Sequence, residues 1–180
     1  NIVVEGFEIH NAPTVGVVIN GQVGSNPTIT PCQGITVSHV DVYNANQNGI
    51  DAAHSESVTI SNCRVINSGE NGIRFTGSSD VSTRIRGSSI IGCTVRGSRG
   101  QDGIVIHEAS NGNDPAKPMA GVGFTIRDNI STDNKENGFD ITTGSNVLLY
   151  GNTSARNGQG GILIGHTANQ VEVIRHYALH

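Results

Sequence analysis

A short phrase built around one glycine recurs along the chain, and this repeat constrains the fold more than any other feature. In each copy the glycine is followed by an apolar residue, a variable residue and, in most cases, a second apolar residue. The copies are centred on Gly16, Gly49, Gly72, Gly103, Gly138 and Gly161. An aliphatic residue stands twelve positions before each glycine: Val4, Val37, Ile60, Ile91, Ile126 and Leu149. A repeated unit of this length is typical of solenoids, in which stacked units bury a shared core.

The pattern inside each repeat indicates strands rather than helices, because apolar and polar residues alternate with period two. In the third repeat we expect strands at residues 58–60, 63–65 and 72–75, with a bend at Asn62 and a turn at residues 68–71. Asn-Gly pairs could instead be hairpin turns, but the constant distance to the upstream aliphatic residue favours stacked coils. The sequence therefore predicts an all-β fold, a right-handed parallel β-helix of about six to seven coils.

The 180 residues are expected to form a single parallel β-helix domain, residues 1–180. Neither end shows a capping helix, and solenoid ends need caps. The domain is therefore expected to be part of a longer chain or to lack its caps, and its ends could pack on other segments or on another chain. No run of 18 apolar residues suggests a membrane span. The chain opens inside a repeat and shows no signal peptide, so it is expected to be a mature form, a domain or a truncated form. A secreted, extracellular or periplasmic location is expected.

All insertions between repeats follow the glycine strand, at residues 20–34, 76–89 and 108–123. Loops that grow from one edge of a sheet build a wall beside it, and binding residues often lie on such loops. The last insertion contains Lys117 and, at residues 111–114, oxygen-bearing side chains that could bind Ca²⁺. A plain solvated turn explains the same residues, so no cofactor is required by the sequence.

The variable residue of each phrase is expected to face outward, and adjacent coils are separated by ~4.8 Å. Asp51 and Arg74 are then direct neighbours, and His107 lies in the next outward row. An acid, a guanidinium and an imidazole on one exposed sheet make these three residues the candidate catalytic group. The plain alternative is an ordinary surface ion pair between Asp51 and Arg74, worth ~0–1 kcal/mol. The full outward column reads Val18, Asp51, Arg74, Val105, Asp140 and Leu163.

Basic residues are concentrated in the middle of a chain whose net charge is −4. Such a concentration indicates a local site for a polyanion, although scattered solvated charges would give the same count. Nucleic acid is not expected, because no aromatic residues are interleaved for base stacking. Asp140 lies ~14 Å from Asp51 by strand spacing, too far for a glycosidase pair, whereas Asp51 and Asp102 could fit an inverting distance. The candidate substrate-binding residues are His54, Asp102, Arg84, Arg86, Asp140 and Lys117.

The phrase Asn48-Gly49-Ile50-Asp51-Ala52-Ala53-His54 and the repeat that follows it resemble carbohydrate-active β-helices. The nearest likeness is to the catalytic modules of mannuronan C5-epimerases and alginate lyases. The family's catalytic phrase is Tyr-Gly-Phe-Asp-Pro-His, and aligned by its glycine it matches this chain at Asp51. Asn48 and Ala53 stand at the tyrosine and histidine positions, and His54 is one residue late.

This resemblance implies an enzyme that acts on an acidic, uronate-containing polysaccharide as a lyase or C5-epimerase. Arg74, helped by Arg84 or Arg86, would neutralise the substrate carboxylate, and His107 or His54 would be the base. Asp51 would orient the imidazole or, while protonated, assist the neutralisation. Two alternatives stay open: a glycoside hydrolase using paired aspartates, and a non-catalytic glycan-binding or structural segment of a surface protein, phage spike or adhesin.

Overall fold

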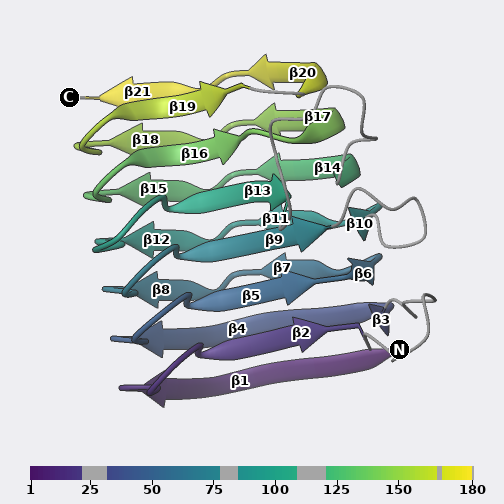
Figure 1. Cartoon of the computed structure of the whole chain (residues 1–180), viewed down its shortest axis with the longest axis vertical. Helices are drawn as coiled ribbons and strands as arrows, with labels where there is room; N and C mark the ends of the chain where they lie inside the picture. Colours follow the sequence, from purple (N-terminus) through teal and green to yellow (C-terminus); the bar gives the residue numbers. More distant parts are fainter. Residues whose placement is uncertain (22–31, 78–84, 109–120, 166–167, 180) are drawn as a thin grey trace.

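The computed structural model describes residues 1–21, 32–77, 85–108, 121–165 and 168–179, and these form a stack of coils with no helix among them. The chain winds upward from its N-terminus, so each coil lies directly on the previous one (Figure 1). Every strand pair between coils is parallel, as in β1 with β4 and β13 with β16. The predicted parallel β-helix is therefore confirmed.

One sheet runs up the front of the stack in Figure 1 and contains the glycine strand of every coil, in the order β19-β16-β13-β9-β5-β2. Each strand contributes one or two outward side chains, so the sheet presents flat rows of residues to solvent. Its members are β2 (Val17–Asn20), β5 (Ile50–Ala53), β9 (Ile73–Gly77), β13 (Ile104–Glu108), β16 (Asn137–Ile141) and β19 (Gly160–Ile164).

The remaining strands form a second, bent sheet that closes the coils behind the first. Left-handed residues mark its bends, among them Asn62 with φ 52° and Asn67 with φ 58°, as the sequence predicts for Asn62. Its members are β1 (Ile2–His10), β3 (Cys32–Gln33), β4 (Ile35–Tyr43), β6 (Ser55–Glu56), β7 (Thr59–Ser61), β8 (Arg64–Ile66), β10 (Ile85–Arg86), β11 (Ser89–Ile91), β12 (Thr94–Arg96), β14 (Gly121–Arg127), β15 (Ile130–Thr132), β17 (Gly144–Tyr150), β18 (Thr153–Ala155), β20 (Asn169–Ile174) and β21 (Tyr177–Leu179).

The core is a set of aliphatic columns between the two sheets, with three large aromatic side chains. Phe75, Phe124 and Phe139 are all buried, and Phe75 meets Phe124 edge to face at 5.0 Å between ring centroids. One aliphatic column departs from the prediction. Ile60 pairs with Ile90, and Ile91 pairs with the outward Ser61, so Ile91 was the wrong choice for the fourth coil.

The repeated glycine serves close packing between coils. A Cβ on Gly72 would lie 2.1 Å from Val95 Cγ1 and 2.6 Å from the carbonyl oxygen of Gly103. Atoms cannot approach so closely, so any side chain here would push neighbouring coils apart. Of the two roles that the sequence allowed, positive φ or close packing, the structure selects close packing at this position.

Both ends of the stack expose apolar side chains, including Ile2 and Val3 on the first coil and Tyr177 and Leu179 on the last. Within the described residues, no helix has the length and apolar character to cross a bilayer.

Candidate functional site

The outward column of the front sheet has the register that the sequence predicts. Asp51 pairs with Arg74, Arg74 with Val105, and Val105 with Asp140. The second outward row is also confirmed, because Ala53 pairs with Thr76 and Thr76 with His107. Polar side chains from four successive coils therefore face the same way.

Asp51 and Arg74 form a two-pronged ion pair across adjacent coils. The Arg74 Nε donates to Asp51 Oδ1 at 3.0 Å, and Nη2 donates to Oδ2 at 2.6 Å. The side chains are 32% exposed for Arg74 and 12% for Asp51, so solvent screens the pair only in part. The hydrogen bonds from Arg74 to Asp51 raise the pKa of Arg74 above its ordinary value, despite partial burial. The pair fixes the guanidinium in one place on the sheet.

A cavity of about 320 Å³ opens directly above this pair, over β9, β13 and β16. Its charged and titratable lining residues come from three coils: Arg74, Asp102, His107, Glu136 and Asp140. Arg74 and His107, two of the three candidate catalytic residues, therefore share one hollow. Asp51 reaches it only through Arg74.

Asp140 is the most perturbed of these groups. It is 8% exposed, and one carboxylate oxygen, Oδ1, is buried and has no hydrogen-bond partner within the described part of the chain. Burial raises the pKa of Asp140 to about 7, helped by the negative charges of Asp102 and Glu136 and by a hydrogen bond with Asp102. Near neutral pH, this carboxyl can therefore hold a proton and donate it.

Asp102 is held in place by a ladder of buried amide side chains that runs up the turn edge of the front sheet. Its Oδ1 accepts hydrogen bonds from the Asn137 backbone nitrogen at 2.8 Å and from Asn137 Nδ2 at 2.9 Å. Its own backbone nitrogen donates to Asn71 Oδ1 at 3.2 Å, and Asn71 in turn binds Asn48. This ladder is the structural reason for Asn or Asp before the repeated glycine, and it directs the Asp102 carboxyl toward Asp140.

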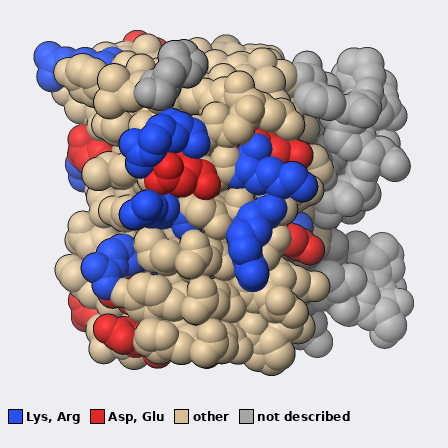
Figure 2. Space-filling model, turned by 90° about the vertical axis from the view of Figure 1, so that its left-hand side faces the viewer, with Lys and Arg blue, Asp and Glu red and all other residues tan. Residues whose placement is uncertain are grey.

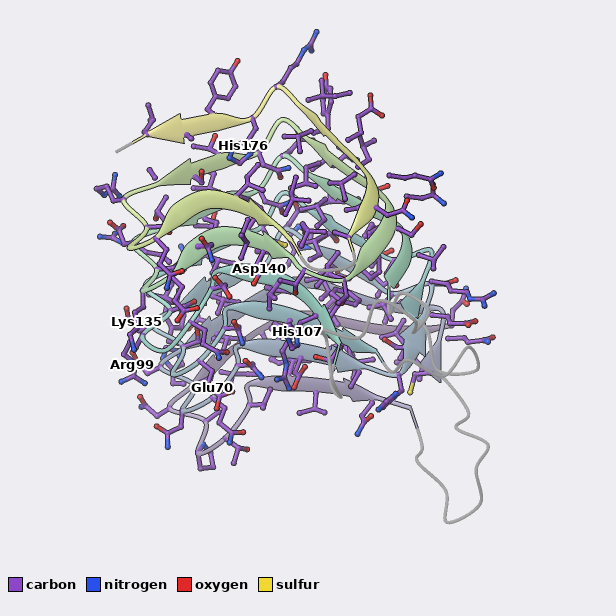
Figure 3. All side chains as sticks on the ribbon, turned by 45° about the horizontal axis from the view of Figure 1, so that its top comes forward. Glu70, Arg99, His107, Lys135, Asp140 and His176 are labelled. Carbon is purple, nitrogen blue, oxygen red and sulfur yellow. The ribbon has the colours of Figure 1, made fainter. Side chains whose placement is uncertain are left out.

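His107 lies at the last outward position of β13 and is exposed at the mouth of the cavity. Figure 3 shows His107 and Asp140 over the same sheet, contributed by neighbouring coils. A neutral imidazole has a basic ring nitrogen, so His107 is the candidate group to accept a proton from a bound substrate.

Two other predicted substrate-binding residues lie away from this cavity. His54 has φ 46° at the corner between β5 and β6, and burial lowers its pKa below the ordinary value. Its Nδ1 is buried and without a partner in the described residues, and His54 does not line the cavity that holds His107. Arg86 lies on β10 of the other sheet, with its Nε 4.0 Å from Glu56 Oε1, and does not line the cavity beside Arg74.

The remaining predicted residues, Arg84 and Lys117, and the candidate calcium-binding residues 111–114 lie outside the described residues. Among the residues that are described, no cluster of three or more His, Cys, Asp or Glu side chains could hold a metal ion.

Sequence analysis missed Glu136 and Gln101, which line the cavity from the turns that precede β16 and β13. It also separated Asp102 from Asp140, although the two carboxyls lie on adjacent coils. The repeat contained the signal for this proximity. Asp102 directly precedes the glycine of one copy, and Asp140 lies two residues after the glycine of the next copy. The prediction considered only pairs that included Asp51.

Comparison with known proteins supports the same architecture. A family model described as a right handed beta helix region matches residues 1–88 and 28–176. No curated protein matches this sequence significantly.

Among solved structures, a double mutant of the periplasmic alginate epimerase AlgG is similar over 96% of this chain, at 14% identity and a TM-score of 0.73. The enzymatically active domain of bacteriophage CBA120 tailspike protein 2 is similar over 98%, at 17% identity and a TM-score of 0.64. The A-module of the Azotobacter vinelandii mannuronan C-5 epimerase AlgE6 is similar over 98%, at 13% identity and a TM-score of 0.53. The chain spans 38%, 31% and 56% of these three structures. At such identities the likeness establishes the fold.

Proposed function

This chain belongs to the right-handed β-helix family, and we propose that it binds an acidic, uronate-containing polysaccharide on the front sheet and abstracts the proton at C5. The observation that carries the proposal is the cavity in which Arg74, His107 and Asp140 converge. A fixed cation, an imidazole and a protonated carboxylic acid are the three groups that this chemistry needs. The fold that it shares with two alginate epimerases lends support.

The C5 proton of a uronate is only weakly acidic, because the negative charge of the adjacent carboxylate opposes formation of a carbanion at C5. The carboxylate can stabilise the carbanion once its own charge is neutralised. Arg74, held by Asp51, supplies a permanent positive charge beside the cavity. Protonated Asp140 supplies a hydrogen bond in a site from which water is partly excluded. Both contributions grow as negative charge moves onto the carboxylate oxygens in the transition state.

In the first step His107 removes the C5 proton, and the bonding electrons move into the neutralised carboxylate group. Two outcomes then balance atoms and charge. If Asp140 donates its proton to the opposite face of C5, the product is the C5 epimer, and Asp140 and His107 then return to their starting protonation states by exchange with solvent. If the bond from C4 to the glycosidic oxygen breaks instead, a C4–C5 double bond forms, and Asp140 can protonate the departing oxygen.

A second candidate function is glycoside hydrolysis, favoured by the group of Asp140, Asp102 and Glu136 in one cavity. Asp140 would be the general acid, and a second carboxylate would activate water. The likeness to a tailspike enzymatic domain lends support. A non-catalytic glycan-binding role needs the same surface but no proton transfer.

Incubation with alginate, polymannuronate and pectate tests these alternatives together. Unsaturated uronate ends, detected by ultraviolet absorbance, indicate a lyase, and solvent deuterium at C5 without chain cleavage indicates an epimerase. New saturated reducing ends indicate a hydrolase. If none of the three uronans is changed, the proposed enzymatic function is wrong.

A further inference from the structure

Two cations, Arg99 and Lys135, lie on adjacent turns and are close in sequence to Gln101 and Glu136, which line the cavity. Arg99 N donates to Ser68 O, on the turn before β9, at 2.8 Å, and Lys135 N donates in the same way to Ser98 O, on the turn before β13, at 2.9 Å. Arg99 and Lys135 therefore occupy equivalent positions on neighbouring coils, ~4.8 Å apart along the stack. Figure 3 shows them next to one another at the turns, to one side of Asp140 and His107.

The turns that carry these cations are anchored from within. Ser98 and Asn134, each immediately before one of the two cations, are buried, and the Ser98 backbone nitrogen donates to Asn134 Oδ1 at 3.0 Å. Ser98 Oγ also lies 3.1 Å from Ser68 Oγ. The positions of the two cations on the backbone are thus set by buried hydrogen bonds, although the side chains themselves extend outward from the turns (Figure 3).

Arg99 and Lys135 also differ from most other cations of the structure, because neither has a carboxylate partner within the described residues. Figure 2 shows a face on which cations and acids lie side by side. Six arginines have an acid within 4.0 Å: Arg64, Arg74, Arg86, Arg96, Arg127 and Arg156. Arg99 and Lys135 lie on neighbouring turns, so their like charges repel each other, and an anion that bridges them would relieve this repulsion.

The location of the pair connects it to the cavity. Gln101 lies two residues after Arg99, Glu136 directly follows Lys135, and both line the cavity. On the other coils the equivalent turn positions are Pro13, Asn46, Gly69 and Gly158. Among the described coils, a cation therefore occurs at this position on two coils only. These are the coils whose turns also place Gln101 and Glu136 in the cavity.

We propose that Arg99 and Lys135 form a carboxylate-binding subsite at the turn edge of the cavity, which selects a charged uronate over a neutral sugar. The proposal rests on the function proposed above and names the feature of the protein that recognises substrate charge. Arg74, held by Asp51, faces the uronate that reacts, and most other charged groups of the cavity are acids, so the carboxylate of a neighbouring uronate finds its counter-charge at this edge. Arginine and lysine side chains are both good partners for carboxylates.

The experiment measures affinity by isothermal titration calorimetry with a mannuronate trisaccharide and with the same trisaccharide after reduction of its carboxyl groups to alcohols. The double variant Arg99→Gln/Lys135→Gln should bind the acidic trisaccharide roughly three- to thirtyfold more weakly than the wild type. Both proteins should bind the reduced trisaccharide equally. The matched control Arg127→Gln/Arg175→Gln removes two exposed charges from the other side of the coil and should retain wild-type affinity.

The outcomes separate this proposal from the proposed function. If the wild type binds the acidic trisaccharide and the Arg99/Lys135 variant binds it equally well, the subsite is wrong while the enzymatic function stands. If the control loses as much affinity as the variant, net charge rather than this subsite is responsible, which also overturns the proposal. If binding depends on Arg99 and Lys135 but no uronan is turned over, the subsite stands and the enzymatic function fails.

Discussion

Replacement of Asp140 by asparagine should stabilise the protein at alkaline pH. The asparagine would keep the size of the side chain, and its amide can donate to Asp102 as the protonated carboxyl does. Asp140 is 8% exposed and has a pKa of about 7 instead of 3.8. The folded protein therefore holds a proton that the unfolded chain has released.

The sign follows from this difference in pKa. The stabilisation from the bound proton is complete below pH 3.8 and is lost as pH rises to about 7. Above that pH the contribution of Asp140 to the free energy of unfolding no longer changes. The full loss corresponds to ~4 kcal/mol, because each pKa unit is worth about 1.4 kcal/mol. Asparagine does not ionise and avoids this loss. The gain in unfolding free energy of Asp140→Asn over the wild type should grow by roughly 3 kcal/mol between pH 5 and pH 8.

Urea denaturation followed by far-ultraviolet circular dichroism at pH 5, 6, 7 and 8 measures this gain. Asp128→Asn is the matched control, since Asp128 is an exposed carboxylate paired with Arg127 on the other sheet, and it should follow the wild type more closely. A gain that is absent or that does not change with pH would refute the assignment of a proton to Asp140. In the same variant, turnover of a uronan should fall about a hundredfold or more, because the proton donor is gone.

Three further outcomes are expected. Gly72→Ala should destabilise the fold by about 1–3 kcal/mol or more in urea denaturation, because its Cβ would lie 2.1 Å from Val95 Cγ1; unchanged stability would show that the coils can separate freely. Asn129→Ala should cost about 1–3 kcal/mol in the same assay, since the buried Cys93 backbone nitrogen loses its acceptor, and a neutral effect would mean that water replaces the amide. Uronan turnover should decline as pH rises through about 7, where Asp140 loses its proton, and a rate that climbs steadily to alkaline pH would contradict its role as an acid.

Much of the fold could be predicted because a β-helix repeats one physical requirement in every coil. An outward residue must lie between two inward ones, so Asp51, Arg74 and Asp140 could be assigned to one column from the glycine alone. The fourth coil broke the spacing rule because its turn contains one extra residue, Gly100, whose Cβ would lie 2.5 Å from the carbonyl oxygen of Gly69. Two consecutive isoleucines preceded that turn, and only the three-dimensional register decides which one is buried.

The candidate site was less predictable because it depends on side-chain direction at the turn edge. Asn137 binds one Asp102 oxygen, and Asp102 also shares a hydrogen bond with Asp140; no sequence spacing reports such contacts. The raised pKa of Asp140 is likewise a result of burial. His54 shows the reverse. It directly follows β5 in the sequence, but its left-handed backbone at the corner takes it out of the outward row of the front sheet.

The most direct test of the account is hydrogen exchange at C5 of polymannuronate, measured by NMR after incubation in D₂O. The wild type should introduce deuterium at C5, alone or together with unsaturated chain ends, while His107→Gln should introduce about a hundredfold less, or lower still. Equal exchange by the wild type and His107→Gln would remove the imidazole from the mechanism. Absence of exchange by the wild type, across alginate and pectate as well, would contradict proton abstraction on this sheet.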